Sequence, residues 1–153
     1  MSKIIFRRIG GRIVPVKISS VKSNAAMGWH KMRNMIAKVE GKVVGSLSFG
    51  PKMYKPKTFK IGEVSVDKAF QKKGIAGQLY KRLHEFAKKA GATKIESTQI
   101  ISPAALKLRN KFDSSFYSLG KGNRKRKISY EQAQKILRTK SVSNLRAITK
   151  VKK

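Results

Sequence analysis

The first half of the chain is a series of short runs rich in β-branched and aromatic residues, separated by glycine-containing turns. Residues 4–18 (IIFRRIGGRIVPVKI) contain two such runs around Gly10–Gly11, a dipeptide suited to a tight hairpin turn. Residues 35–40 and 43–49 form a second pair around Gly41–Lys42, which predicts another hairpin. Pro15 lacks a backbone N–H, so it fits only an edge or irregular position of a strand.

An amphipathic helix is predicted over residues 78–91 (QLYKRLHEFAKKAG). Its apolar residues recur at helical spacing and form one stripe: Leu79, Leu83, Phe86, Ala87 and Ala90. The charged residues occupy the other side, and Gly91 is placed to end the helix in the left-handed conformation. Residues 58–67 (TFKIGEVSVD), before this helix, predict a strand.

Shorter elements complete the first 120 residues. They are, in order, a helix over 25–34 capped by Asn24, a loop over 50–58, a strand over 92–101, a helix over 104–112 capped by Ser102, and a strand over 112–120. A strand, a helix and a parallel strand in succession form a right-handed βαβ unit.

The composition changes after Gly120. Residues 121–127 (KGNRKRK) read as a basic linker, and the capping-box spacing of Ser129 and Gln132 predicts a helix over 130–139. Residues 142–148 are expected to add one or two helical turns. The chain therefore divides into a domain over 1–120 and a basic helical tail over 121–153, which either docks on the domain or a partner or forms a solvated arm.

Charge is the extreme feature of the composition. The chain holds 37 Lys and Arg against 7 Asp and Glu, a formal net charge of +30. A small domain needs a net charge of only about 2–8 for solubility, so we expect a nucleic acid or another polyanion in its surroundings. The absence of cysteine excludes disulfides, thiolate metal sites and a cysteine nucleophile, and no apolar run reaches the roughly 20 residues of a membrane span. These features predict a cytoplasmic protein, free or associated with nucleic acid or a virion, with no metal site.

The turn QKKGIAG (71–77) carries the candidate chemistry. It precedes a helix whose first N–H groups have no intrahelical acceptor and whose dipole favours an anion. Gly74 and Gly77 let the backbone approach a ligand closely. The turn lacks both the Walker pattern and the dinucleotide fingerprint. It is therefore either an ordinary basic turn or a pyrophosphate cradle.

The sequence around this turn resembles the GCN5-related N-acetyltransferases, or GNAT family. Residues 71–76 (QKKGIA) match the family's R/Q-x-x-G-x-G/A loop, and VSVD (64–67) stands in the place of its preceding strand. Residues 102–112 (SPAALKLRNKF) resemble its second conserved helix. The resemblance covers about residues 35–119. The N-terminal segment also faintly resembles those of phage-encoded proteins.

The resemblance implies an α/β (α+β) fold with a twisted mixed sheet, splayed at the cofactor strand and flanked by helices. It implies acetyl-coenzyme A as the cofactor, a primary amine as the acceptor and acyltransferase chemistry. Direct attack by the amine would be helped by an oxyanion site and by acid and base groups. The residues that would bind the cofactor are Val64, Val66, Gln71, Lys72, Lys73, Gly74, Ile75, Ala76, Gly77, Ser102 and Ala105.

The catalytic residues are less well marked. The tyrosine that often protonates the leaving thiolate falls at position 109, which is Arg109, a poor proton donor. Tyr117 is the candidate replacement. Glu63 and Ser65 share a strand face, and if Val64 and Val66 face the core, Glu63 points into the cleft and is the first candidate base. Glu96 is the second; the alternative for each carboxylate is a surface salt bridge.

Two functions follow from these observations. The first is an N-acetyltransferase whose acceptor the sequence does not identify. The second is a weakly active or inactive protein of the same fold that binds nucleic acid or sits inside a virus particle. Acetyl-coenzyme A binding separates the two.

Overall fold

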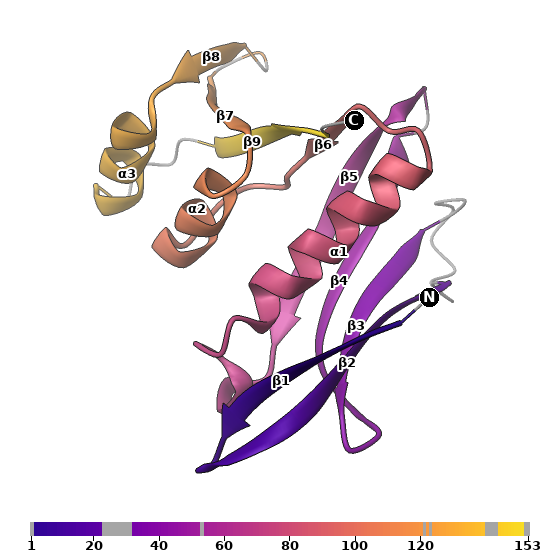
Figure 1. The fold of residues 1–153 in the computed structure, drawn as a ribbon. Helices are drawn as coiled ribbons and strands as arrows, with labels where there is room; N and C mark the ends of the chain where they lie inside the picture. The colour runs from indigo at the N-terminus through magenta and orange to yellow at the C-terminus, as the bar shows by residue number, and fades with distance from the viewer. Residues whose placement is uncertain are drawn as a thin grey trace.

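The computed structural model describes residues 2–22, 32–52, 54–120, 122, 124–139 and 144–151. Within them, nine strands form one mixed sheet in the order β1-β2-β3-β4-β5-β6-β9-β7-β8, accompanied by three α-helices (Figure 1). The strands are β1 Lys3–Ile9, β2 Arg12–Lys22, β3 Arg33–Val39, β4 Lys42–Lys52, β5 Lys55–Val66, β6 Lys94–Glu96, β7 Ser114–Leu119, β8 Lys125–Ile128 and β9 Asn144–Lys150. The helices are α1 Ile75–Lys89, α2 Pro103–Asn110 and α3 Tyr130–Arg138, and a short 3-10 turn spans Lys68–Phe70.

The first five strands form an antiparallel meander. Both predicted hairpins are confirmed, with Gly10 and Gly11 at φ 59° and 81° in the first turn. In the second, Glu40 and Gly41 take the positive φ angles, so the turn lies one residue earlier than predicted. The β2–β3 pairing starts at Lys17, so Pro15 pairs with β1 alone and needs no second hydrogen-bonded neighbour.

Two predictions in this half are wrong. The loop expected over 50–58 is a hairpin, because β4 continues to Lys52 and β5 begins at Lys55. The helix expected over 25–34 lies mostly outside the described residues, but its last two, Arg33 and Asn34, belong to β3.

Helix α1 packs across the meander, as Figure 1 shows. The predicted stripe is largely confirmed, since Leu79, Leu83 and Ala87 are fully buried. They join Phe49, Phe59 and other strand residues in one hydrophobic core. Gly91 follows the helix at φ 79°, as expected of a left-handed C-terminal glycine.

The sheet opens after the crossover through α1. Strand β6 runs parallel to β5 over only three pairs, from Thr58–Lys94 to Lys60–Glu96. The strand expected over 92–101 is therefore limited to Lys94–Glu96. Beyond Lys60, β5 continues alongside β4 while the chain after β6 departs toward α2 (Figure 1). The predicted splay at the cofactor strand is confirmed.

The segment after Gly120 is not the helical tail that the sequence suggests. The predicted linker contains the start of β8, which pairs with β7. Helix α3 is confirmed with its capping box between Ser129 and Gln132. Of the helical turns expected over 142–148, residues 142 and 143 lie outside the described residues and the rest belong to β9, which inserts between β6 and β7. Leu145 and Ala147 of β9 build a second core with α2, α3 and β7.

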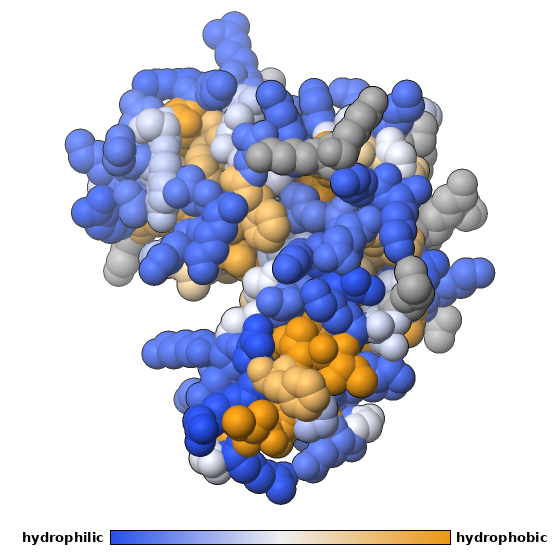
Figure 2. Space-filling model, viewed as in Figure 1, coloured by the Kyte–Doolittle hydropathy of each residue, from blue (hydrophilic) through white to orange (hydrophobic). Residues whose placement is uncertain are grey.

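The surface is mainly hydrophilic, and one of its apolar areas lies over the β1–β2 hairpin (Figure 2). Ile4, Phe6 and Ile13 are all more than half exposed. No helix in the described ranges is long and apolar enough to cross a membrane.

Candidate functional site

The turn before α1 presents an uncapped helix N-terminus. Gly74 is the N-cap residue at φ 76°, no side chain caps the helix, and its first turn holds no acidic residue. The preceding Lys72 also has a positive φ, 60°. The first N–H groups of α1 therefore point outward without a carboxylate or hydroxyl acceptor. Together with the helix dipole they suit a phosphate group.

Two side chains hold this turn in place. The Gln71 amide Nε2 donates to the Val66 carbonyl at 2.9 Å, which ties the turn to the end of β5. From β1, Arg7 Nε donates to the Lys73 carbonyl at 2.8 Å. A Cβ on Gly74 would lie 3.6 Å from Arg7 Nε, so this guanidinium sits directly over the turn. Sequence reasoning missed Arg7, since 66 positions separate it from Lys73 and no motif links them.

The remaining turn residues present backbone rather than side chains. Ile75 is 1% exposed and belongs to the core. Gly77 faces α2, because a Cβ there would lie 3.7 Å from Leu108 Cδ1. The contribution of Ile75, Ala76 and Gly77 to an anion site would be their N–H groups.

A β-bulge marks the point where β5 parts from β6. Leu47 pairs with Val64 and Phe49 with Ile61, so Ser48 alone opposes Gly62 and Glu63. Ser48 Oγ accepts from the Glu63 N–H at 2.7 Å. A Cβ at position 62 would lie 2.5 Å from that oxygen, so any larger residue there would force the Ser48 hydroxyl to move. The sequence signal for this feature is a glycine inside a strand pattern.

Beyond the bulge, β5 turns backbone groups toward the opened side of the sheet. The N–H groups of Glu63 and Asp67 point to β4, where they bond Ser48 Oγ and the Val44 carbonyl. Strand alternation then directs the N–H groups of Val64 and Val66 away from β4. The pairing with β6 has already ended at Lys60, so these two groups face the opened side of the sheet.

The predicted side-chain directions on β5 agree with this arrangement. Val64 and Val66 pack against the core, while Glu63 and Ser65 are exposed. Ser65 Oγ lies 3.4 Å from Ser46 Oγ on β4. Glu63 thus offers a solvated carboxylate beside the cleft-facing N–H of Val64.

Glu96, the second candidate base, is ion-paired. Its carboxylate lies 2.6 Å from Lys52 Nζ. Burial acts to raise the pKa of Glu96, but the hydrogen bond and charge of Lys52, with Lys125 and Lys55, hold it below its ordinary value. The group stays ionised and is a weak base.

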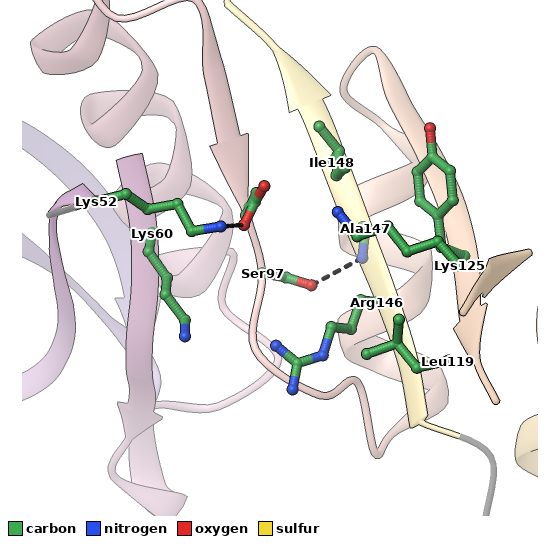
Figure 3. A pocket seen from close by; sticks show the side chains of 10 residues that line it. Lys52, Lys60, Ser97, Leu119, Lys125, Arg146, Ala147 and Ile148 are labelled. Carbon is green, nitrogen blue, oxygen red and sulfur yellow. Dashed lines mark hydrogen bonds and ion pairs between the residues drawn. The ribbon is translucent and has the colours of Figure 1, made fainter. Parts of the chain in front are cut away.

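Tyr117 lies in a pocket of about 270 Å³ on the sheet face opposite α1 (Figure 3). The pocket is lined by Lys52, Lys60, Glu96, Ser97, Tyr117, Leu119, Lys125, Arg146, Ala147 and Ile148. Strands β6 and β9 separate β7 from β5. At a strand spacing of about 4.8 Å, Tyr117 stands about 14 Å from β5, on the same face as Glu96 but apart from Glu63.

Helix α2 begins as predicted. Ser102 Oγ accepts from the Ala105 N–H at 3.1 Å and caps the helix, with Pro103 in the first turn. Arg109, at the position of the family tyrosine, is 6% exposed and places its guanidinium 4.1 Å from the centre of the Tyr80 ring. Burial raises the pKa of Tyr80 against the opposing charge of Arg109, so the phenol stays protonated. This buried pair was not foreseen from the sequence.

Among the described residues no group of three or more His, Asp or Glu side chains could hold a metal ion.

Comparisons with known proteins agree with the geometry. The family model for the Acetyltransferase (GNAT) family matches residues 17–112. A search of curated proteins gave no match. Among solved structures, an IAA acetyltransferase from Bacillus cereus aligns with a TM-score of 0.57 at 20% identity, covering 88% of this chain and 99% of that one.

Two further similar structures were solved with the cofactor. An acetyltransferase from Bacillus subtilis in complex with CoA aligns with a TM-score of 0.56 at 19% identity, covering 79% of this chain and 78% of that one. A putative acetyltransferase from Salmonella typhimurium with acetyl-CoA aligns with a TM-score of 0.55 at 19% identity, covering 80% and 66%. These likenesses show a shared fold, and the family model spans more than half of the sequence. The chain belongs to the GNAT acetyltransferase family.

Proposed function

We propose that this chain is an acetyl-CoA-dependent N-acetyltransferase that modifies a primary amine. The observation that carries the proposal is the continuity between two features: the opened edge of β5 at Val64–Val66, and the uncapped helix N-terminus at Gly74. Gln71 ties these two features together. An elongated ligand with a thioester at one end and a pyrophosphate further along fits this arrangement.

The residues present fit acetyl-CoA. The N–H groups of residues 72–77 would hold the pyrophosphate, and the overlying Arg7 guanidinium would add positive charge. The N–H groups of Val64 and Val66 would bind the chain that carries the thioester. When bound, acetyl-CoA supplies an acetyl group activated for transfer.

The chain itself would contribute positioning and proton handling. A cleft-facing N–H of Val64 or Val66 would stabilise the negative charge that develops on the acetyl carbonyl oxygen. Glu63, directly or through a water held with Ser65, would take the proton from the attacking amine. Tyr117 lies three strands from β5, which favours a role on the acceptor side over protonation of the leaving thiolate.

Calorimetric titration with acetyl-CoA tests the proposal. The wild type should bind at moderate salt, and Gly74→Glu should weaken binding about tenfold or more, because it puts a carboxylate at the anion site. Gly91→Glu is the matched control. It introduces the same charge at nearly the same φ, 79° against 76°, but at the far end of α1.

Because a +30 protein attracts anions generally, the comparison of the two variants decides the result. Failure of the wild type to bind, or equal weakening by both variants, would overturn the proposal.

A further inference from the structure

Arg109 carries a buried positive charge that has no counterion in the described part of the chain. The side chain is 6% exposed, and its Nε is buried without a hydrogen-bond partner there. No carboxylate among the described residues is ion-paired with it. A guanidinium keeps its proton, and burying an unpaired cation is costly, the more so in a protein of net charge +30. This cost points to an anionic ligand.

The groups that face the guanidinium from α1 are aromatic. Its central carbon lies 4.1 Å from the centre of the Tyr80 ring, which attracts the cation without neutralising it. His84, one turn further along α1, supplies no negative charge, and burial together with the charge of Arg109 lowers its pKa to about 4. From β7, Ser114 Oγ donates to the Arg109 carbonyl at 2.8 Å and ties down the end of α2. The cation is therefore held in place with its charge uncompensated.

The guanidinium stands level with the opened part of β5. A Cβ on Gly45 would lie 3.4 Å from Val66 Cγ2 and 3.5 Å from Ile75 Cγ2, so α1 begins beside Val66. Helix α1 then runs back along β5 (Figure 1). Tyr80 lies about 7.5 Å along the helix from Ile75. Val64 lies about 7 Å back along the strand from Val66, so Tyr80 and the guanidinium beside it are level with Val64.

Helix α2 lies beside α1 on the side where the sheet opens (Figure 1). A Cβ on Gly77 would lie 3.7 Å from Leu108 Cδ1, and Tyr80 follows Gly77 on the same face of α1. Beyond Lys60, β5 pairs with no strand on this side in the described part of the chain. Arg109 therefore borders the stretch of β5 along which the thioester would lie.

We propose that the Arg109 guanidinium binds the sulfur of the CoA leaving group and stabilises it as a thiolate. The inference rests on the proposed acetyltransferase function, which puts the thioester at Val64–Val66. The N–H groups of that stretch suit the acetyl oxygen, and the sulfur is the other thioester atom on which negative charge develops. A guanidinium offers charged donors but gives up no proton, so it suits a sulfur that leaves as an anion.

The transfer then balances without a proton donor to sulfur. The amine nitrogen bonds to the acetyl carbon, and the carbon–sulfur bond breaks with its electron pair left on sulfur. Glu63 takes the proton that the amine loses and passes it to solvent. The products are the amide, the thiolate paired with Arg109, and one proton. Tyr117, three strands from β5, is not needed for this step.

The thiol of bound CoA reports on this contact independently of turnover. The chain has no cysteine, so in a complex with CoA the ligand supplies the only thiol. Its ionisation is followed by the ultraviolet absorbance of the thiolate from pH 6 to pH 9, after subtraction of the ligand-free protein. Bound to the wild type, the thiol should have a pKa at least about one unit below that of free CoA, about a tenfold change in the ratio of thiolate to thiol.

Arg109→Gln should return the thiol pKa close to that of free CoA, whereas Arg109→Lys keeps the charge and should retain part of the shift. Lys107→Gln is the matched control, because it removes one positive charge from an exposed position of the same helix. Tyr80→Phe keeps the ring beside the guanidinium and should keep the shift.

An unshifted thiol pKa in the wild-type complex would overturn the inference, and that measurement needs no variant to fold. Equal losses of the shift in Arg109→Gln and Lys107→Gln would also overturn it, because the net charge of the protein would then explain the shift. Loss of the shift in Tyr80→Phe would do the same, because the phenol would then be the group that acts on sulfur.

CoA calorimetry on the same samples separates this inference from the proposed function. Absence of CoA binding to the wild type overturns both. CoA binding with an unshifted thiol pKa counts against the role of Arg109 alone.

Discussion

His84 is a titratable group set into the α1 surface. Its imidazole stacks on the Phe112 ring with 4.4 Å between centroids and 3° between planes. Burial, reinforced by the charge of Arg109, lowers the pKa of His84 from 6.5 to about 4. Between these two pH values, His84 is therefore protonated in the unfolded chain and neutral in the folded chain.

From this shift we expect stability to be at its full value above pH 6.5 and to fall as the pH drops toward 4. Because the imidazole is partly solvated, the loss should be about 1–2 kcal/mol. Urea unfolding at pH 7, 6 and 5 measures it. The His84→Gln variant should show a flatter profile over that range, and an unchanged slope would contradict the assignment.

At the residue scale, the site residues that could be predicted from the sequence are those that lie close together along the chain. Gln71 and Gly74 were predicted from six consecutive positions and lie as expected in the turn before α1. Arg7 and Ser48 were not predicted. Their contacts depend on strand pairing across 66 and 15 positions, which no local pattern encodes.

The bulge in β5 lies just beyond the point where β5 stops pairing with β6. Gly62→Ala would place a Cβ 2.5 Å from Ser48 Oγ and should destabilise the fold by about 1–3 kcal/mol. Adding Ser48→Ala removes that oxygen and leaves the nearest remaining Ser48 atom, its Cβ, 3.7 Å away. The double variant should recover part of the loss in urea unfolding. If the losses of unfolding free energy in the two single variants simply add in the double variant, the contact between position 62 and Ser48 Oγ does not explain the effect of Gly62→Ala.

Strand β9 is the element that joins the two halves of the sheet. Leu145 is fully buried in the second core. Leu145→Ala should cost about 2–5 kcal/mol of unfolding free energy, from lost burial and the cavity left behind. Ile101→Ala, at a side chain 80% exposed, is the control and should change it by less than about 0.5 kcal/mol. Similar losses of unfolding free energy in the two variants would mean that the packing of β9 contributes little to stability.

Elements were predicted well where turn chemistry or helical period was strong. The glycine-containing turns predicted the hairpins of the meander, and the apolar stripe predicted the helix α1 that covers it. The segments over 50–58 and 142–148 were wrong for a shared reason. Prolines in the first segment and the shortness of the second hide strands whose formation depends on partners distant in sequence.

At the scale of the molecule, charge dominates behaviour toward other molecules. A net charge of +30 spread along the chain should bind nucleic acid by counterion release. Binding to double-stranded DNA should weaken by about 10³-fold or more between 50 and 200 mM NaCl if six or more phosphates are contacted. Fluorescence anisotropy at several salt concentrations measures the slope. A flat response would count against a nucleic-acid partner, and Arg146→Gln should alter the slope by no more than about one contact.

The central place of β9 has a consequence for how the protein is made. The ribosome delivers β6, β7 and β8 before β9, yet β9 must enter between β6 and β7. Until it does, two strand edges that are paired in the mature protein stay open to other nascent or misfolded chains. The meander and α1 can assemble while synthesis continues, but the second half of the sheet must wait for its last strand. Biogenesis is therefore the stage at which this protein is most exposed to aggregation.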